Sequence, residues 1–525
     1  MSDHPHQPAP VSPALSNAVI LQEIFLFRGI SVKRLRLVSR LWNEVVLSLP
    51  KARLRLRLNH GRKGACCNPA KFLDTIFPTL SSPKLARWIC IRKGCSDHCR
   101  ASAGELLAPL CARYSDTIRG IWISFKVSIL PAVALILAAG CPNLKELSVS
   151  CPPRGSEEDA TQEMWEFNLP QKFKLTYISL QVDDAPNPFI QKVLDSAPNL
   201  KTLILYANVY PDLGVNTKLV NLCYYGGGLD EADAQAPFNA AEMTRLISQV
   251  GNSLKLLKIG VNTNFGKYSP TPQNFSLPET MPKLALYCNG SVDIFKSRDE
   301  LGGLREAVRY KNLYKIELGS SAVTEKGLLD KFLEKWINSE VPLVFPGVKR
   351  LLFHGLSDFS VLEKLRKVCP AVTDLFLVTH AKCGENGGDD EGHGVFGNQL
   401  KGLVSMGGLS AIKLFLTMPL KLSDAVKGFS DNEELFKGGQ LKLFELYSTC
   451  HPTYVIDDLW ISGKLKKFGV KNCIVMFENV LRSMRTLEMS GILLHCDTAL
   501  RIVNLIQHEN LPVQLTGHRM GPRAC

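Results

Sequence analysis

The chain has 525 residues and a formal net charge of +13, with 45% hydrophobic and 21% charged residues. This composition excludes an extensively disordered chain, and the length allows either several ordinary domains or one small domain with a long repeat array. The first residues are polar and rich in proline, and the longest apolar stretch, 129–140, is shorter than the roughly 20 residues that span a bilayer. We therefore expect no membrane contact and a cytoplasmic or nuclear location, or both.

Positive charge is concentrated near the N-terminus. Between Arg28 and Lys63 there are eleven Lys or Arg residues and one acid, Glu44. Such a patch favours an acidic protein surface or a phosphate, and nucleic acid is an alternative partner because its affinity for proteins is largely electrostatic. A solvated cationic helix face gives the same pattern, so we do not expect nucleic acid to be the main partner.

The segment 15–49 predicts two or three short amphipathic helices. Helical spacing first relates Val19, Ile20, Glu23, Ile24 and Phe27. After Gly29, we expect Ser31 to be the N-cap of a helix that carries Leu35, Val38, Leu41, Trp42 and Val45. The apolar residues are too many for one face, so the segment is expected to pack against the rest of the chain or to offer a face to another protein.

A short apolar pattern recurs along most of the remaining chain. It consists of an apolar residue, two variable residues, an apolar residue, one variable residue and a third apolar residue. The clearest copies begin at Ile118, Leu144, Leu175, Leu200, Leu254, Leu313, Val348 and Val372; weaker ones begin at Leu219, Leu441 and Met484, and looser ones lie near Leu284 and Leu409. These thirteen candidates lie about 30 residues apart, with gaps from 19 to 43. The alternation of the last two apolar positions predicts a short strand with one buried face.

Helical patterns precede several of these strands. They cover residues 131–140, 188–196, 242–250, 299–308, 358–368 and 475–483. A turn with Gly, Cys-Pro or Ala-Pro often follows, and proline stops a helix because it lacks an N–H. One such unit cannot bury its own apolar side, so the units must stack with parallel strands on one side and helices on the other. An ordinary α/β domain with leucine-rich strands is the alternative.

The repeated units resemble the leucine-rich repeat family, in particular the type with a CPNLKEL-like sequence that recurs in F-box proteins; CPNLKEL itself stands at 141–147. The resemblance covers residues 115–495. It implies an α/β solenoid with parallel strands on the concave face and helices on the convex face. The ragged period and the lack of a regular Asn or Cys after each strand depart from the family, so the repeat number and boundaries stay open.

The N-terminal segment resembles the F-box. Leu15 stands where the motif has its opening leucine, Ile24 and Phe25 match its Ile-Phe pair, and RLVSRLWNEV, with Val38, Arg40 and Trp42, matches its closing stretch. The resemblance implies docking on the adaptor subunit of a cullin–RING ubiquitin ligase through Leu15, Ile20, Ile24, Phe25, Leu35, Val38 and Trp42. Ser16 and Ser39 stand where the family has Pro and Cys. The alternative is an N-terminal cap of the repeat array, with Ile24, Phe25 and Trp42 as its core.

Few residues suggest chemistry. Zinc ligands are conceivable at Cys66, Cys67, Cys95, His98 and Cys99, but the first two are adjacent and cannot form the usual C-x2-C pair, so we expect no metal. A glycine-rich stretch between His380, Cys383 and His393 is interpreted as a solvated insertion loop. We interpret most of the 16 cysteines, such as Cys141, Cys223 and Cys369, as reduced, buried small hydrophobes. The sequence carries no phosphate-loop, zinc-protease, serine-hydrolase or kinase signature, and we expect no cofactor and no enzyme activity.

The sequence thus predicts five segments: a tail (1–13), an F-box-like segment (14–50), a basic, Cys-containing connecting or capping region (51–114), the repeats (115–510) and a C-terminal tail (511–525). The resemblances together imply the substrate-recognition subunit of an SCF-type ubiquitin ligase, with a target protein held on the concave face. The expected target-binding residues there are Trp122, Tyr177, Tyr206, Tyr225, His354, Phe376 and Tyr447. A leucine-rich-repeat interaction or inhibitor scaffold without a ligase role is the alternative.

Overall fold

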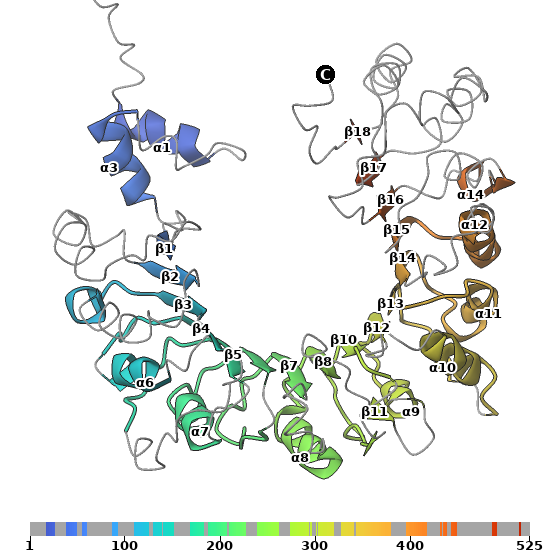
Figure 1. The fold of residues 1–525 in the computed structure, drawn as a ribbon, viewed down its shortest axis with the longest axis horizontal. Helices are drawn as coiled ribbons and strands as arrows, with labels where there is room; N and C mark the ends of the chain where they lie inside the picture. Colours follow the sequence, from blue (N-terminus) through green and yellow to red (C-terminus); the bar gives the residue numbers. More distant parts are fainter. Residues whose placement is uncertain are drawn as a thin grey trace, which may run out of the picture. The chain divides into compact units, whose positions relative to one another are not determined.

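The computed structural model describes residues 17–26, 38–49, 55–59, 87–92, 110–124, 130–138, 140–151, 168–182, 187–206, 209–226, 239–261, 273–292, 295–296, 301, 303–319, 327–340, 343–379, 395–416, 431–432, 434–437, 443–448, 486–490 and 514–515. The chain divides into two compact units, residues 1–202 and 203–525. Each unit is an α/β structure whose strands pair in parallel and in chain order. Within each unit the helices that lie between strands in the chain are all on one side of the strands, which is compatible with a solenoid-like array (Figure 1).

The first unit begins with two helices and continues with a parallel sheet. The helices are α1 (Ala18–Leu26) and α3 (Arg40–Ser48). The strands are β1 (Arg55–Asn59), β2 (Trp88–Arg92), β3 (Gly120–Ser124), β4 (Glu146–Cys151) and β5 (Tyr177–Val182), each paired with the next. Helices α6 (Leu130–Ala138) and α7 (Asn187–Asp195) follow β3 and β5. Strand β6 (Thr202–Tyr206) starts on the last residue of this unit.

The second unit continues the same alternation. Its main strands are β7 (Asn221–Gly226), β8 (Leu256–Val261), β10 (Leu286–Asn289), β12 (Lys315–Gly319), β13 (Arg350–His354), β14 (Asp374–Thr379), β15 (Ala411–Leu416), β16 (Leu443–Ser448), β17 (Thr486–Ser490) and β18 (Gln514–Leu515). Its helices are α8 (Ala240–Val250), α9 (Leu304–Ala307), α10 (Leu328–Ile337), α11 (Val361–Val368), α12 (Val395–Met406) and α14 (Glu434–Lys437). A small separate pair joins β9 (Gln273–Asn274) and β11 (Phe295–Lys296).

The prediction of parallel strands from the repeated pattern is confirmed. Each of the thirteen candidate copies carries a strand, from β3 to β17. Five of the six predicted helices are present as α6, α7, α8, α9 and α11, whereas residues 475–483 lie outside the described residues. Strands β1 and β2 fall in the region 51–114, where we expected no repeat, and they pair in parallel with each other and with β3.

The helix that carries Trp42 corrects one expectation. It begins at Arg40 and not after Ser31, because Ser39 is extended (φ −157°, ψ 170°) and its Oγ accepts a hydrogen bond from the Trp42 N–H at 3.2 Å. A serine in this role satisfies one of the N–H groups left open at the start of a helix. Val38 therefore lies in the turn before the helix.

The core of each unit lies between its strands and its helices. The last two apolar positions of the pattern are buried in nearly every described copy, as Leu147 and Val149 show in β4 and Leu351 and Phe353 show in β13. The amphipathic helices bury their apolar side, which in α8 is formed by Met243, Leu246, Ile247 and Val250. The variable positions between the buried residues face away from the helices, and we call the surface they form the strand face of each unit.

An asparagine just before the strand links neighbouring repeats. Asn143, Asn199 and Asn312 each precede the first leucine of a motif. Their side-chain amides donate to the backbone oxygens of Asp116, Phe173 and Pro282 in the preceding repeat, at 2.6, 3.0 and 2.6 Å. The Asn of the CPNL-like sequence therefore donates a hydrogen bond to a backbone carbonyl of the preceding repeat. This bond explains why an asparagine stands at this position of the motif.

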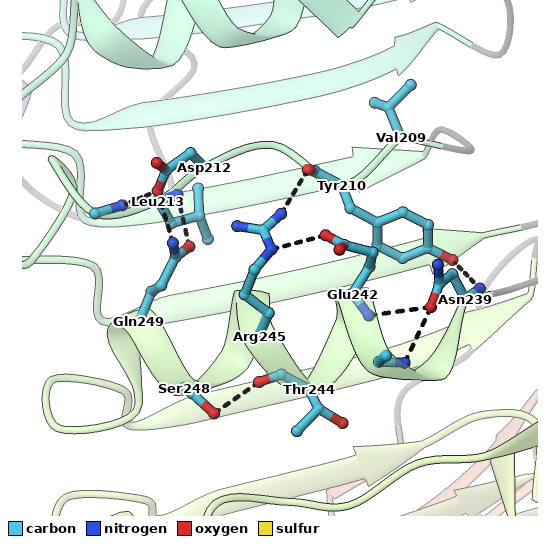
Figure 2. Close-up of polar contacts among 12 residues, drawn as sticks. Val209, Tyr210, Asp212, Leu213, Asn239, Glu242, Thr244, Arg245, Ser248 and Gln249 are labelled. Atoms are coloured by element: carbon cyan, nitrogen blue, oxygen red, sulfur yellow. Dashed lines mark hydrogen bonds and ion pairs between the residues drawn. The ribbon is translucent and has the colours of Figure 1, made fainter.

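The connection between β6 and β7 has no helix among its described residues. Side chains of α8 form hydrogen bonds with this connection instead (Figure 2). Arg245 Nη2 donates to the backbone oxygen of Tyr210 at 2.9 Å while its Nε pairs with Glu242 at 2.7 Å. Gln249 accepts from the backbone N–H of Leu213 at 2.9 Å and donates to Asp212 at 2.7 Å. These contacts tie residues 210–213 of the connection to α8.

Candidate functional site

The strand face of the second unit carries charged and aromatic side chains in rows across the strands. The register aligns Cys223 of β7 with Lys258 of β8, and Lys258 in turn with Cys288 of β10. The same row continues from Cys288 to Glu317 of β12. Two residues further along each strand the next row follows, because successive side chains of a strand alternate between its faces.

One carboxylate in this row binds three basic side chains. Lys258 Nζ donates to Glu317 Oε1 at 3.0 Å, Lys315 Nζ lies 3.4 Å from Oε2, and His354 Nε2 lies 3.4 Å from Oε1. The Glu317 side chain is 11% exposed, whereas those of Lys258, Lys315 and His354 are 32%, 23% and 40% exposed. We call these four residues the charged cluster. Within the charged cluster the carboxylate is nearly buried, whereas the basic groups are partly exposed to solvent.

The protonation states follow from burial and from neighbouring charge. Burial by itself would raise the pKa of the Glu317 carboxyl, but the hydrogen bond with His354 and the charges of Lys258 and Lys315 outweigh burial and hold that pKa well below its ordinary value. Burial raises the pKa of the Cys223 thiol to about 11 and that of the Cys288 thiol well above its usual range. Both thiols are therefore neutral near pH 7 and add no negative charge to the row.

Aromatic rings lie on both sides of the charged cluster. Tyr206 and Tyr225 are stacked, with ring centroids 4.4 Å apart and planes 8° apart. Lys258 Nζ lies 5.9 Å from the centroid of the Tyr225 ring. On the other side, the rings of His354 and Phe376 are 6.2 Å apart and those of Phe376 and Phe415 are 5.5 Å apart.

Between these aromatic groups three neighbouring strands each present a glycine. Gly260 of β8, Gly290 just after β10 and Gly319 of β12 lie side by side, and we call them the glycine row. A Cβ added at Gly260 would lie 3.3 Å from Tyr225 Cδ1, and one at Gly319 would lie 3.2 Å from His354 Cβ. A Cβ added at Gly290 would meet nothing closer than the Ile259 carbonyl oxygen at 3.5 Å.

The structure brings together four of the expected target-binding residues, in two pairs. Tyr206 contacts Tyr225, and His354 contacts Phe376. Tyr447 lies in β16, but its side chain is outside the described residues. Sequence reasoning missed Lys258, Lys315, Glu317 and the glycine row. The three charged residues occupy variable positions of the pattern, and Gly260 and Gly319 directly follow its last apolar residue. The register between the strands aligns them.

The strand face of the first unit holds the other two expected residues, in different surroundings. Trp122 lies edge-on to Trp88, with centroids 6.4 Å apart, and Trp88 packs over Gly120. Tyr177 is half-buried at the start of β5. Hydroxyl groups occupy much of the rest, and Ser150 Oγ donates to Gln181 Oε1 at 3.0 Å.

The helices α1 and α3 form their own small core. It consists of Leu21, Phe25, Val45, Val46 and Leu49, with Ile24, Leu41 and Trp42 packed against it. Phe25 is only 4% exposed, and its ring lies 5.1 Å from that of Trp42. Among the residues predicted to bind an adaptor, Ile20 and Val38 are exposed, at 40% and 59%, as is their neighbour Val19 at 69%. Leu15 and Leu35 lie outside the described residues.

Other sequence candidates can be placed only in part. The conceivable zinc ligands Cys66, Cys67, Cys95, His98 and Cys99 lie outside the described residues, as do the glycine-rich stretch 380–393 and most of the basic segment 28–63. Within the described ranges no group of three or more His, Cys, Asp or Glu side chains is placed to hold a metal ion. The cysteines that the structure describes with their side chains, among them Cys141 and Cys369, are free thiols, mostly buried. No helix in the described part of the chain is long and apolar enough to cross a membrane.

Comparison with models of protein families and with curated proteins gives no match for this chain. The functional argument therefore comes from the residues and their geometry.

Proposed function

We propose that this protein is the substrate-recognition subunit of an SCF-type ubiquitin ligase. In this proposal the helices α1 and α3 are an F-box that binds the adaptor, and the strands and helices that follow them in the chain form leucine-rich repeats whose strand face holds a target protein. The protein's contribution would be proximity and orientation of the target, because such a receptor performs no bond chemistry itself.

The observation that carries the proposal is that the α1–α3 pair has both a buried core and exposed apolar residues. The pair already buries a core of its own, yet Val19, Ile20 and Val38 remain exposed. Apolar side chains left uncovered on so small a helical pair favour a partner surface. A parallel array of strands that presents variable side chains beyond this pair supports a second, target-binding surface on the same chain.

The experiment is a pull-down of the full-length protein by the purified adaptor subunit of a cullin–RING ligase. We expect the wild type to bind and the double variant Ile20→Asp, Val38→Asp to lose binding, because a buried carboxylate without a partner opposes an apolar interface. Both positions are exposed, so the variant should keep the fold, which circular dichroism checks. Val215→Asp is the matched control, because Val215 is 52% exposed in the second unit; it should bind like the wild type.

A second candidate is a leucine-rich-repeat interaction scaffold without a ligase role, in which the helices only cap the repeats. The burial of Phe25 against Trp42 favours it, because two of the residues that match the F-box best already pack against each other within the pair, Phe25 in its core and Trp42 at the edge of that core. A wild-type protein that does not bind the adaptor would leave this scaffold as the function and rule out the ligase subunit.

A further inference from the structure

We propose that the strand face of the second unit binds an extended segment of a partner protein that presents a carboxylate side chain, with its backbone over the glycine row and its carboxylate at the charged cluster. The inference deepens the target-binding half of the proposed function, and it does not depend on the adaptor.

The charge of the cluster selects an anion. Two ammonium groups, those of Lys258 and Lys315, share one carboxylate, that of Glu317. Because the carboxylate is the least exposed member, the charge presented to solvent is positive. The neighbouring thiols of Cys223 and Cys288 are neutral near pH 7, so nothing else in this row compensates the surplus. An incoming anion would form charge-assisted hydrogen bonds, which are among the stronger polar contacts in proteins.

The same surplus favours a carboxylate over a phosphate. The excess is one fixed positive charge, which matches a single carboxylate, whereas a phosphorylated side chain carries close to two negative charges. The cations are lysines, which act as point charges, and the cluster contains no guanidinium fork of the kind that suits phosphate. Arg350, on the same face of β13, already pairs with Asp374 at 2.7 Å.

The glycine row offers room for the backbone of such a segment. Side chains are missing at three adjacent strand-face positions, and a Cβ at the middle one, Gly290, would make only ordinary van der Waals contacts. Neighbouring strands lie about 4.8 Å apart, so the row spans about 10 Å, which corresponds to about three residues of extended chain. A bulky residue at any of these positions would remove this space.

Aromatic rings mark the two ends of the row and fit apolar neighbours of the carboxylate. Tyr225 leans over Gly260 and is itself stacked on Tyr206, while His354 flanks Gly319 and contacts Phe376. Rings of this kind supply large contact areas at a low entropic cost. We therefore expect the preferred segment to carry an apolar residue on each side of its acidic residue.

The test uses the full-length protein and three fluorescein-labelled peptides: Gly-Phe-Glu-Phe-Gly, the same peptide with Gln for Glu, and the same peptide with phosphoserine for Glu. Fluorescence anisotropy should show the Glu peptide binding at least about fivefold more tightly than the Gln peptide, because only the Glu peptide forms the charge-assisted contact. Equal binding of these two peptides, tighter binding of the phosphoserine peptide, or no binding of the Glu peptide would each overturn the proposal.

Two variants locate the site. Gly290→Leu fills the middle of the glycine row without altering a charge and should weaken the Glu peptide about tenfold or more, whereas the control Ser148→Leu, which adds the same side chain to the strand face of the first unit, should bind like the wild type. Lys315→Gln should weaken the Glu peptide and leave the Gln peptide unchanged. Wild-type affinity in Gly290→Leu would exclude this site.

The outcome is separable from that of the ligase proposal. Gly290→Leu should still be captured by the adaptor, and the Ile20→Asp, Val38→Asp variant should still bind the Glu peptide. Peptide binding without adaptor capture would support the site and refute the ligase subunit, and the reverse result would refute the site alone.

Discussion

The strand faces of the two units are built on the same motif and carry different chemistry. In the first unit the outward positions in the middle of β4 and β5 hold Ser148, Ser179 and the hydrogen-bonded pair of Ser150 and Gln181, which are neutral, while the acidic Glu146 stands at the start of β4. In the second unit the equivalent positions of β8 and β12 hold Lys258 and Glu317, within an ion-paired cluster. Both sets stand on parallel strands with the same alternation of buried and outward residues.

The buried and the outward positions of the motif are therefore under different constraints. The buried positions must be apolar because neighbouring coils close over them. The outward positions contribute little to that packing, so they are available for recognition. The backbone alone therefore does not distinguish a neutral face from a charged one, and only the residues between the leucines do.

The largest expected effect tests the part that the two units share. Leu180 of β5 and Leu375 of β14 are both buried, at 0% and 1% exposure. Leu180→Ala and Leu375→Ala should each lower the free energy of unfolding by about 2–5 kcal/mol, because each change deletes packed methyl groups and leaves a cavity. Urea unfolding of the wild type and of both variants measures the change in the free energy of unfolding. A loss in one unit and none in the other would show that the cores are not equivalent.

A smaller effect should separate the charged cluster from the neutral outward residues of β4 and β5. Glu317→Gln leaves Lys258 and Lys315 close together without their shared anion, and we expect a loss of about 1–3 kcal/mol in the free energy of unfolding. Ser150→Ala is the counterpart in the first unit; it deletes one neutral hydrogen bond and should cost no more than about 1 kcal/mol. Equal losses in the two variants would contradict the special role of the charged cluster.

The Glu317 contribution should also depend on pH in one direction. Because the folded protein holds the pKa of this carboxyl well below its ordinary value, its stabilisation is fully present above the unfolded pKa of roughly 4.3 and is lost as the pH falls below that value through the folded pKa. The difference in unfolding free energy between the wild type and Glu317→Gln should therefore be smaller at about pH 3 than at pH 7. A difference that grows on acidification would show that the pKa is shifted upwards.

The sequence predicted the strands well because burial imposes a period on them. Thirteen motif copies were enough to place thirteen of the strands from β3 to β17, even where the spacing is ragged, but not the two-residue strands β9 and β11. Helices α10 and α12 were not predicted, although the buried residues Leu329, Phe332, Leu333 and Trp336 of α10 follow a helical period.

The candidate site was predicted only in part, and for a physical reason. Aromatic residues such as Tyr225 and His354 could be identified one strand at a time. The charged cluster and the glycine row each join residues from different strands that are far apart in sequence, as Lys258 and Glu317 show with a separation of 59. Only the register between strands brings them together, and the uneven lengths of the connections hide that register in the sequence.

The smallest expected effect tests whether burial, and not pairing alone, gives the charged cluster its strength. Arg350 Nε lies 2.7 Å from Asp374 Oδ2 in the same unit, a closer approach than any pair in the cluster, but the Arg350 side chain is 57% exposed. Solvent screens such a pair, so Arg350→Gln should cost only about 0.2–1 kcal/mol, and less at high salt. Urea unfolding of Arg350→Gln and Glu317→Gln at low and high salt compares the two. If Arg350→Gln cost as much as Glu317→Gln, burial within the strand face would not be what makes the charges of the second unit important. The contrast with the neutral Ser148, Ser150, Ser179 and Gln181 of the first unit would then reduce to the presence of ion pairs.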